Sequence, residues 1–190
     1  ILFTTRGGST IHLYKNNGGI NFTNVSIESN LGQEMEARTA IAGDYDNDGD
    51  LDLFIGATIG SSKFFQNNGD GTFQDITNLT GIYVNDQVRG CSWFDFNQDG
   101  YLDLYVGLLF EPNLLYKNNG DGTFIDIAQN VGATGPIGAG IIMGLGAIDY
   151  NRDGYQDLYF TQDIYNGNIL LYIEYGSFFT DVSYSSQTDL

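Results

Sequence analysis

The chain has 190 residues, and its 24 Asp and Glu side chains outnumber its 7 Lys and Arg, so the formal net charge is −17 at pH 7. This charge argues against nucleic acid as a partner, because a protein that binds phosphate backbones needs a basic patch. A content of 42% hydrophobic and 14% aromatic residues indicates a folded core rather than an acidic disordered tail. The single cysteine excludes an intrachain disulfide. No apolar run reaches the roughly 18 residues of a transmembrane helix, so we expect no membrane insertion.

Two sequence blocks alternate along the chain with a spacing of about 51 residues. The first block is acidic and reads DYDNDGDLDLFIG from Asp44, DFNQDGYLDLYVG from Asp95 and DYNRDGYQDLYFT from Asp149. The second block is aromatic, and in its clearest copies Asn-Asn-Gly is followed by a Gly-containing turn. Its four copies, the last of them decayed, begin at Leu13, Phe64, Leu115 and Leu171.

Each repeat predicts four short strands. The first precedes the acidic block, as in Thr39 to Tyr45 and Cys91 to Phe96. The second is an apolar run such as Leu51 to Ile55, which is too short for a helix. The third ends at Asn-Asn-Gly, and the turn after it predicts a hairpin to a fourth strand of the form Thr-Phe-x-Asp-Ile. No long stretch shows convincing helical periodicity.

A four-stranded unit of this length, repeated in tandem, predicts an all-β fold: a β-propeller of four-stranded antiparallel blades. Blades that cover both faces of their inner strands explain why Leu53, Phe54 and Ile55 are continuously apolar. The repeat phase assigns about 3.75 blades to this chain. The predicted units are a partial blade at 1–26 and blades at 37–77, 88–128 and 141–183.

The first unit lacks one strand, because Leu2 and Phe3 align with the second strand of the next repeat. We therefore expect a segment of a longer propeller that continues into further blades. Two alternatives stay open: a four-bladed ring in which Tyr184 to Leu190 supplies the missing strand, and closure by a second copy of the chain.

The acidic loops at 44–52, 95–103 and 149–157 carry oxygen ligands at positions 1, 3, 5 and 9 and a glycine at position 6. We expect the glycine to supply a positive φ that curls the backbone. The odd spacing then directs several oxygens to one point, which suits Ca²⁺ better than zinc. Position 7 varies, which fits a ligand that uses its backbone carbonyl. The candidate ligands for three Ca²⁺ sites are Asp44, Asp46, Asp48, Asp50 and Asp52, then Asp95, Asn97, Asp99, Tyr101 and Asp103, then Asp149, Asn151, Asp153, Tyr155 and Asp157.

Two other structures are compatible with acidic, glycine-containing loops. An EF-hand needs Glu at position 12 and flanking helices, whereas Ile55, Val106 and Phe160 occupy that position inside predicted strands. Asp/Gly-rich β-turns without a metal are the second alternative, and three copies with matching spacing count against it.

The loop D-x-[DN]-x-D-G-x-x-D, followed by N-N-G-D-G-T-F, resembles the FG-GAP and VCBS repeats of integrin α-subunit propellers and of many secreted proteins. The resemblance covers nearly the whole chain. It implies calcium in the hairpins between the first and second strands of each blade, a propeller most often of seven blades, and an extracellular, cell-surface or periplasmic location. It also implies adhesion or binding of a protein or glycan ligand.

Other candidate residues favour structural roles. His12 is the only histidine and lies in a predicted strand, and Cys91 is expected to be a small buried side chain. Trp93 and Tyr83 are candidates to stack on a sugar, but a core role is favoured for Trp93. Catalysis is therefore not expected.

Recognition is expected in the varied loops Glu28 to Glu36, Tyr83 to Arg89 and Gly132 to Gly146. We predict a non-catalytic calcium-binding module for extracellular adhesion or ligand binding. A glycan-binding lectin and an accessory module of a larger secreted enzyme are the alternatives.

Overall fold

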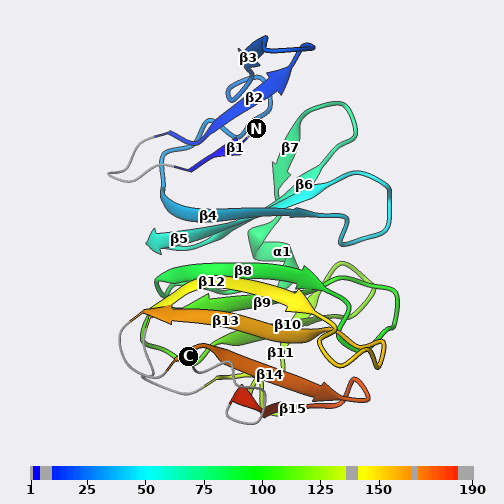
Figure 1. Cartoon of the computed structure of the whole chain (residues 1–190). Helices are drawn as coiled ribbons and strands as arrows, with labels where there is room; N and C mark the ends of the chain where they lie inside the picture. Colours follow the sequence, from blue (N-terminus) through cyan, green and yellow to red (C-terminus); the bar gives the residue numbers. More distant parts are fainter. Residues whose placement is uncertain (1, 5–9, 136–140, 164–166, 184–190) are drawn as a thin grey trace.

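The computed structural model describes residues 2–4, 10–135, 141–163 and 167–183. These residues form fifteen strands in four antiparallel sheets (Figure 1). The first sheet has three strands: β1 (Leu2–Phe3), β2 (His12–Asn16) and β3 (Phe22–Asn24). The second has four: β4 (Glu36–Gly43), β5 (Asp52–Ile59), β6 (Lys63–Asn67) and β7 (Phe73–Asp75).

The third and fourth sheets repeat the same order of neighbouring strands. The third sheet comprises β8 (Val88–Phe94), β9 (Asp103–Leu108), β10 (Leu114–Asn118) and β11 (Phe124–Asp126). The fourth comprises β12 (Ile141–Ile148), β13 (Asp157–Asp163), β14 (Ile169–Glu174) and β15 (Phe178–Asp181). Within each sheet every strand pairs with the next along the chain, so the predicted four-stranded antiparallel units are confirmed.

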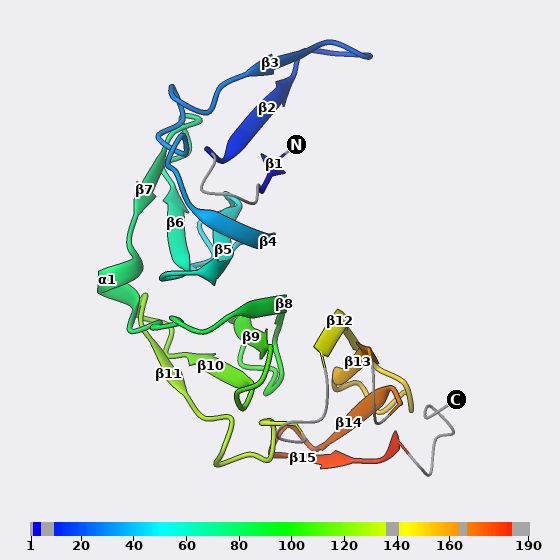
Figure 2. The same cartoon turned by 90° about the vertical axis from the view of Figure 1, so that its left-hand side faces the viewer.

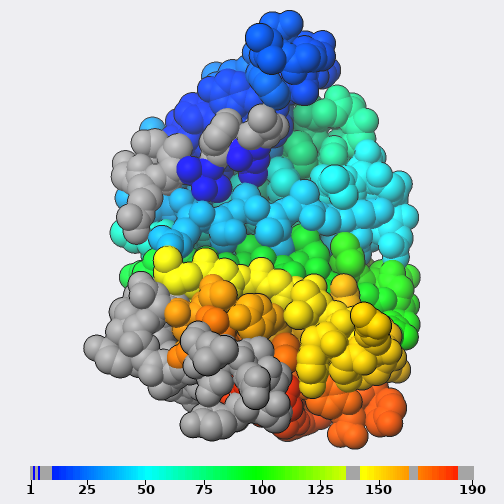
Figure 3. Space-filling model, viewed as in Figure 1, coloured from blue at the N-terminus to red at the C-terminus, as the bar shows by residue number. Residues whose placement is uncertain are grey.

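The sheets follow one another along a curved path (Figure 2). Strands β1, β4, β8 and β12 lie on the concave side of this path, and the last strand of each sheet lies on the convex side. The inner strands pack on one another, β4 against β8 and β8 against β12. In the space-filling view the sheets form successive bands in chain order (Figure 3). This is the arrangement of blades in a propeller.

Hydrophobic cores lie between successive sheets, and the second strand of each of the two middle sheets contributes to two of them. Phe54 of β5 joins the core against the third sheet, whereas its neighbours Leu53 and Ile55 join the core against the first. In β9, Leu104 faces the second sheet and Tyr105 faces the fourth. Successive side chains of a strand point to opposite faces, so a strand between two cores must be apolar throughout. The continuous apolar runs of the sequence are thus explained.

The structure shifts some predicted boundaries. The first strands begin about three residues earlier than expected, because β4 starts at Glu36 and β8 at Val88. The ends of the three varied loops therefore belong to β4, β8 and β12. One short helix, α1 (Thr77–Thr80), follows the second sheet and ends at Gly81, which is left-handed. Residues 136–140 of the third varied loop and the strand proposed for Tyr184 to Leu190 lie outside the described residues.

Within the part of the chain that the structure describes, no helix has the length and hydropathy required to cross a membrane.

Candidate metal centre

The three acidic loops connect the first and second strands of the second, third and fourth sheets. The loop at 44–52 joins β4 to β5, the loop at 95–103 joins β8 to β9, and the loop at 149–157 joins β12 to β13. All three therefore lie at corresponding places at one end of successive blades. Position 12 of each loop falls inside a strand, at Ile55, Val106 and Phe160, which confirms that these are not EF-hands.

The first loop gathers three carboxylates. Asp44, Asp46 and Asp48 each offer an oxygen, and the three oxygens lie within 4.8 Å of one another. Backbone amides hold them in place: Asp48 N donates to Asp44 Oδ1 at 3.1 Å and to Asp46 Oδ1 at 3.3 Å. Gly49 N donates to the other oxygen of Asp44 at 3.0 Å. The loop thus presents fixed carboxylates that converge on one point, as a hard cation requires.

The second and third loops repeat this hydrogen-bond pattern. Asp99 N donates to Asp95 Oδ1 at 3.1 Å, and Gly100 N donates to Asp95 Oδ2 at 2.9 Å. The corresponding bonds in the third loop, from Asp153 N and Gly154 N to Asp149, are 3.1 and 3.0 Å. At position 3 the side-chain oxygens of Asn97 and Asn151 accept from the position-5 amide at 3.1 and 3.2 Å, as Asp46 does in the first loop.

Two left-handed residues curl each loop. The glycine at position 6 has φ of 94°, 91° and 95° in the three loops, as the sequence predicted. Position 4 is also left-handed, although it is Asn47, Gln98 or Arg152, with φ of 61°, 58° and 65°. Because this conformation is unfavourable for a residue with a Cβ atom, sequence reasoning did not assign it.

The side chain at position 7 covers the turn between the third and fourth strands. A Cβ atom added to Gly69 would lie 2.8 Å from Asp50 Oδ2, and one added to Gly120 would lie 3.0 Å from the Tyr101 ring. In the fourth sheet, a Cβ atom added to Gly176 would lie 2.9 Å from the Tyr155 ring. The position-7 side chains therefore pack on the turn glycine, which leaves the backbone carbonyl as the group this residue offers to the loop.

Position 9 is held differently from the other acidic positions. Asp52, Asp103 and Asp157 are fully buried, and each carboxylate accepts two backbone N–H bonds. Asp103, for example, accepts from Phe96 N at 3.2 Å and from Asn118 N at 2.8 Å, and so ties the loop to the third strand. Asp52 is not among the three carboxylates that converge in the first loop. The aspartate at position 9 is thus a buried support in addition to its predicted role as a ligand.

Burial without a cation disfavours the charged form of these carboxylates. Desolvation raises the pKa of Asp52 to about 6 and that of Asp103 to about 7, and it also raises the pKa of Asp157. The backbone N–H bonds and the neighbouring acids act in opposite directions on these pKa values, and the desolvation dominates. A divalent cation in the loop would oppose this cost, so the electrostatics of the buried aspartate fit calcium.

Side chains of the third strands reach back to the loops. Gln66 Nε2 of β6 donates to Asp46 Oδ2 at 2.7 Å. At the corresponding place in the third sheet, Lys117 Nζ of β10 lies 3.4 Å from Asp99 Oδ2. The second loop has fewer carboxylates than the first. In addition, the Lys117 ammonium group lies beside one of its carboxylates, that of Asp99.

Neighbouring loops are also linked to each other through position 4. Asn47 Nδ2 donates to the carbonyl of Gly100 at 3.0 Å, and Gln98 Nε2 donates to the carbonyl of Gly154 at 2.7 Å. Each bond runs from one loop to position 6 of the next loop. The three loops thus form a hydrogen-bonded row along one end of the blades.

The remaining candidates have structural surroundings. Cys91 is buried, and desolvation raises the pKa of its thiol to about 12. Trp93 is partly buried, with its ring centroid 5.7 Å from that of Phe64, so its predicted core role is confirmed. His12 lies in β2, with Nδ1 at 3.4 Å from the amide of Asn24. Tyr83 is exposed.

Two known proteins share sequence similarity with this chain. The chain is 34% identical over 155 residues to cartilage acidic protein 1 of Xenopus tropicalis, and 40% identical over 101 residues to the human protein of the same name. These matches cover 79% and 53% of this chain but 23% and 15% of the relatives, so the chain spans less than a quarter of their length.

A solved structure shares the fold. It is described as the structural basis of specific recognition of non-reducing terminal N-acetylglucosamine by an Agrocybe aegerita lectin, and it superposes with a TM-score of 0.52 at 19% identity. The match covers 91% of this chain and 46% of the lectin.

The family model of the FG-GAP-like repeat matches residues 1–55, 44–106 and 110–160, so that each acidic loop falls within a match. The resemblance found in the acidic loops and the Asn-Asn-Gly turns is therefore confirmed, and the chain belongs to the FG-GAP-like repeat family.

Proposed function

We propose that this chain is a non-catalytic β-propeller module stabilised by three Ca²⁺ ions, one in each acidic loop. The observation that carries the proposal is the convergence of Asp44, Asp46 and Asp48 within 4.8 Å, in a loop whose hydrogen bonds recur in two further blades. Calcium would be held by side-chain oxygens at positions 1, 3, 5 and 9 and by the position-7 carbonyl. Its role is to neutralise the loop and fix the connection between two strands.

Calcium titration by calorimetry tests this proposal. We expect a stoichiometry of three for the unaltered chain and of two for Asp48→Ala, because that change removes one of the converging carboxylates. Asp86→Ala is the control, since Asp86 is an exposed acid outside the loops and its loss changes the net charge equally. If both variants still bound three Ca²⁺ ions, the assignment of Asp48 as a ligand would be contradicted.

We further propose that the module acts outside the cytoplasm, at a cell surface, in the periplasm or in the extracellular space, where it binds a protein or glycan ligand in adhesion. Calcium sites of extracellular modules typically have Kd values of about 0.1 to 1 mM, which suits loops on exposed hairpins such as these. The loops between blades differ in sequence on a repeated scaffold, and such loops are where binding usually resides.

Glycan binding is a second candidate, and a specific surface favours it. A small depression of about 150 Å³ is lined by Asp86, Gln87, Leu109, Phe110 and Glu111. Phe110 is 67% exposed, and Leu109 N donates to the carbonyl of Gln87 at 3.0 Å, which holds the two loops together. An exposed aromatic ring can stack on a sugar, and the oxygens of neighbouring acid and amide groups can accept hydrogen bonds from its hydroxyl groups. The related lectin fold is described as recognising N-acetylglucosamine.

A titration with N-acetylglucosamine in calcium distinguishes the two candidates. If the depression binds sugar, we expect saturable binding that Phe110→Ala weakens at least tenfold. Phe22→Ala serves as the control, because Phe22 is an exposed aromatic residue on β3. If the chain bound neither N-acetylglucosamine nor any sugar of a glycan array, glycan binding would be excluded. The proposal of a calcium-stabilised module would not be affected.

A further inference from the structure

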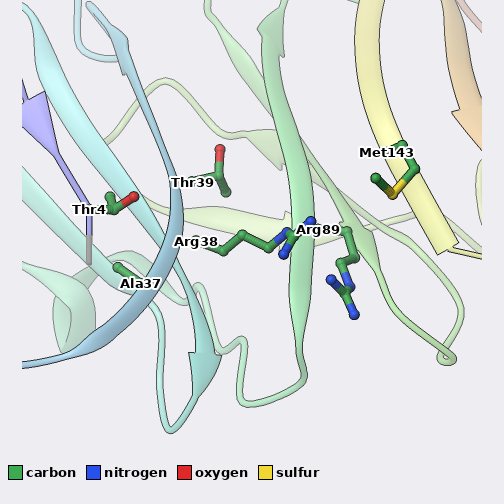
Figure 4. A pocket seen from close by; sticks show the side chains of 6 residues that line it. All are labelled: Thr4, Ala37, Arg38, Thr39, Arg89 and Met143. Carbon is green, nitrogen blue, oxygen red and sulfur yellow. The ribbon is translucent and has the colours of Figure 1, made fainter. Parts of the chain in front are cut away.

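A pocket of about 420 Å³ is lined by residues of the innermost strands, near the strand ends that lie away from the acidic loops. These strands lie on the concave side of the blades (Figure 2). The lining comes from all four sheets or the chain next to them: Thr4, Ala37, Arg38, Thr39, Arg89 and Met143 (Figure 4). Arg38 extends from β4 toward β8, Arg89 stands on β8, and Met143 faces them from β12. The volume lies in the range of small-molecule sites.

The two arginines and the methionine occupy the same position in three successive repeats. Arg38 and Arg89 are 51 residues apart, and Met143 follows 54 later, the same offsets that separate the acidic loops. At each of these residues the pairing of the innermost strand with its neighbour skips one residue: between Ala37 and Thr39, between Val88 and Gly90, and between Ile142 and Gly144. A bulge re-aims the extra side chain. The repeat therefore places one bulge side chain per blade in the pocket.

The charge of this pocket is opposite to that of the molecule. The chain carries −17 overall, yet two of its four arginines line this pocket, and no acidic residue belongs to the described lining. The described salt bridges, Lys63 with Asp75 and Lys117 with Asp99, do not involve Arg38. Two arginine side chains that line one pocket give it a positive potential, which favours an anionic ligand. The planar guanidinium fork matches an oxyanion in two-point contacts.

We propose that this pocket binds a small oxyanion ligand, a molecule that carries a carboxylate, sulfate or phosphate group, through Arg38 and Arg89. Thr4 and Thr39 supply hydroxyl groups to the lining, and Met143 supplies an apolar wall. The proposal does not depend on calcium in the acidic loops, which lie at the ends of the strands and share no residue with the pocket.

Calorimetric titration of the calcium-loaded chain with sulfate, inorganic phosphate and succinate, each in about 100 mM chloride, tests the site. We expect saturable binding of at least one anion, and the anion that binds identifies the oxyanion chemistry. Arg38→Met and Arg89→Met should each weaken this binding at least tenfold. Methionine is the matched replacement because the fourth blade carries it at the same bulge. Lys15→Met, which removes an exposed charge on β2, should change the affinity less than twofold.

A variant that is expected to bind the anion more tightly tests the site even if the arginine variants fail to fold. Met143 is 54% exposed, so Met143→Arg should be tolerated and should tighten binding of the same anion by adding a third guanidinium group. No saturable binding of any of the three anions would overturn the proposal. Equal weakening by Lys15→Met would do the same, because it would show attraction to the general charge of the molecule rather than to the pocket.

Discussion

Single side chains distinguish three loops whose backbones are nearly the same. The first loop has aspartate at position 3, and Gln66 donates a neutral hydrogen bond to it. The second loop has Asn97 at position 3, and Lys117 lies 3.4 Å from Asp99. A cation bound there would meet one carboxylate fewer and one positive charge more. The loops are therefore expected to differ in calcium affinity, with the first loop the strongest and the second the weakest.

Lys117→Gln should raise the calcium affinity of the second loop by about three- to tenfold, because it removes a positive charge close to a divalent ion in a partly exposed site. Glutamine is the matched replacement, since Gln66 occupies the corresponding place in the second sheet. Calcium titration of this variant and of Lys15→Gln, an equal change of charge on an exposed strand residue, checks the expectation. Equal affinities in both variants would show that Lys117 does not act at the site.

At the scale of elements, each acidic loop contacts the next one in chain order. Asn47 reaches the carbonyl of Gly100, and Gln98 reaches that of Gly154. The accepting glycine also donates its amide to the first aspartate of its own loop, as Gly154 N does to Asp149 at 3.0 Å. Ordering one loop therefore helps to order its neighbour, and calcium binding at adjacent loops is expected to be positively coupled.

Gln98→Ala should remove the contact between the second and third loops and weaken calcium binding at the third loop about fivefold, the equivalent of one hydrogen bond of about 1 kcal/mol. The titration should also become less cooperative. Gln74→Ala, an exposed glutamine on β7, is the control. Identical isotherms for the two variants would argue that the loops bind independently.

At the scale of the whole molecule, the sheets are held together by the hydrophobic cores between them. Tyr45 and Phe64 of the second repeat share a core with Leu104 and Phe124 of the third. Disorder in one acidic loop would therefore destabilise its blade, and the neighbouring blades bury their apolar side chains against that blade. Stability in such arrays combines the stability of each repeat with the interface between repeats.

Chelation of calcium should lower the melting temperature of the chain. With a Kd of about 0.1 mM and about 1 mM Ca²⁺, each site contributes roughly 1.4 kcal/mol, so three sites contribute about 4 kcal/mol. For a chain of this size that corresponds to a shift of roughly 8 to 16 °C. The fluorescence of Trp93, which packs between the second and third sheets, reports the transition. A melt that excess chelator leaves unchanged would rule out structural calcium.

Much of this architecture could be predicted because the repeat is local. The apolar runs, the Asn-Asn-Gly turns and the glycine at position 6 each determine the shape of a few neighbouring residues, and the structure confirms them. The features that escaped prediction depend on contacts between blades. The left-handed Gln98 is one, because its side chain bonds to Gly154 in another blade. The bulges at Arg38 and Arg89 are another, because their spacing of 51 residues is visible in the sequence but their pairing is not.

The row of loop contacts has a direction. Every described bond between loops is donated by position 4 of one blade and accepted by position 6 of the following blade, beginning at Asn47 and ending at Gly154. The row is therefore polar: its first member, Asn47, donates, and its last member, Gly154, accepts. A further blade or a second copy that extended the row through the same contact would use a heterologous interface, because a two-fold axis brings like groups together.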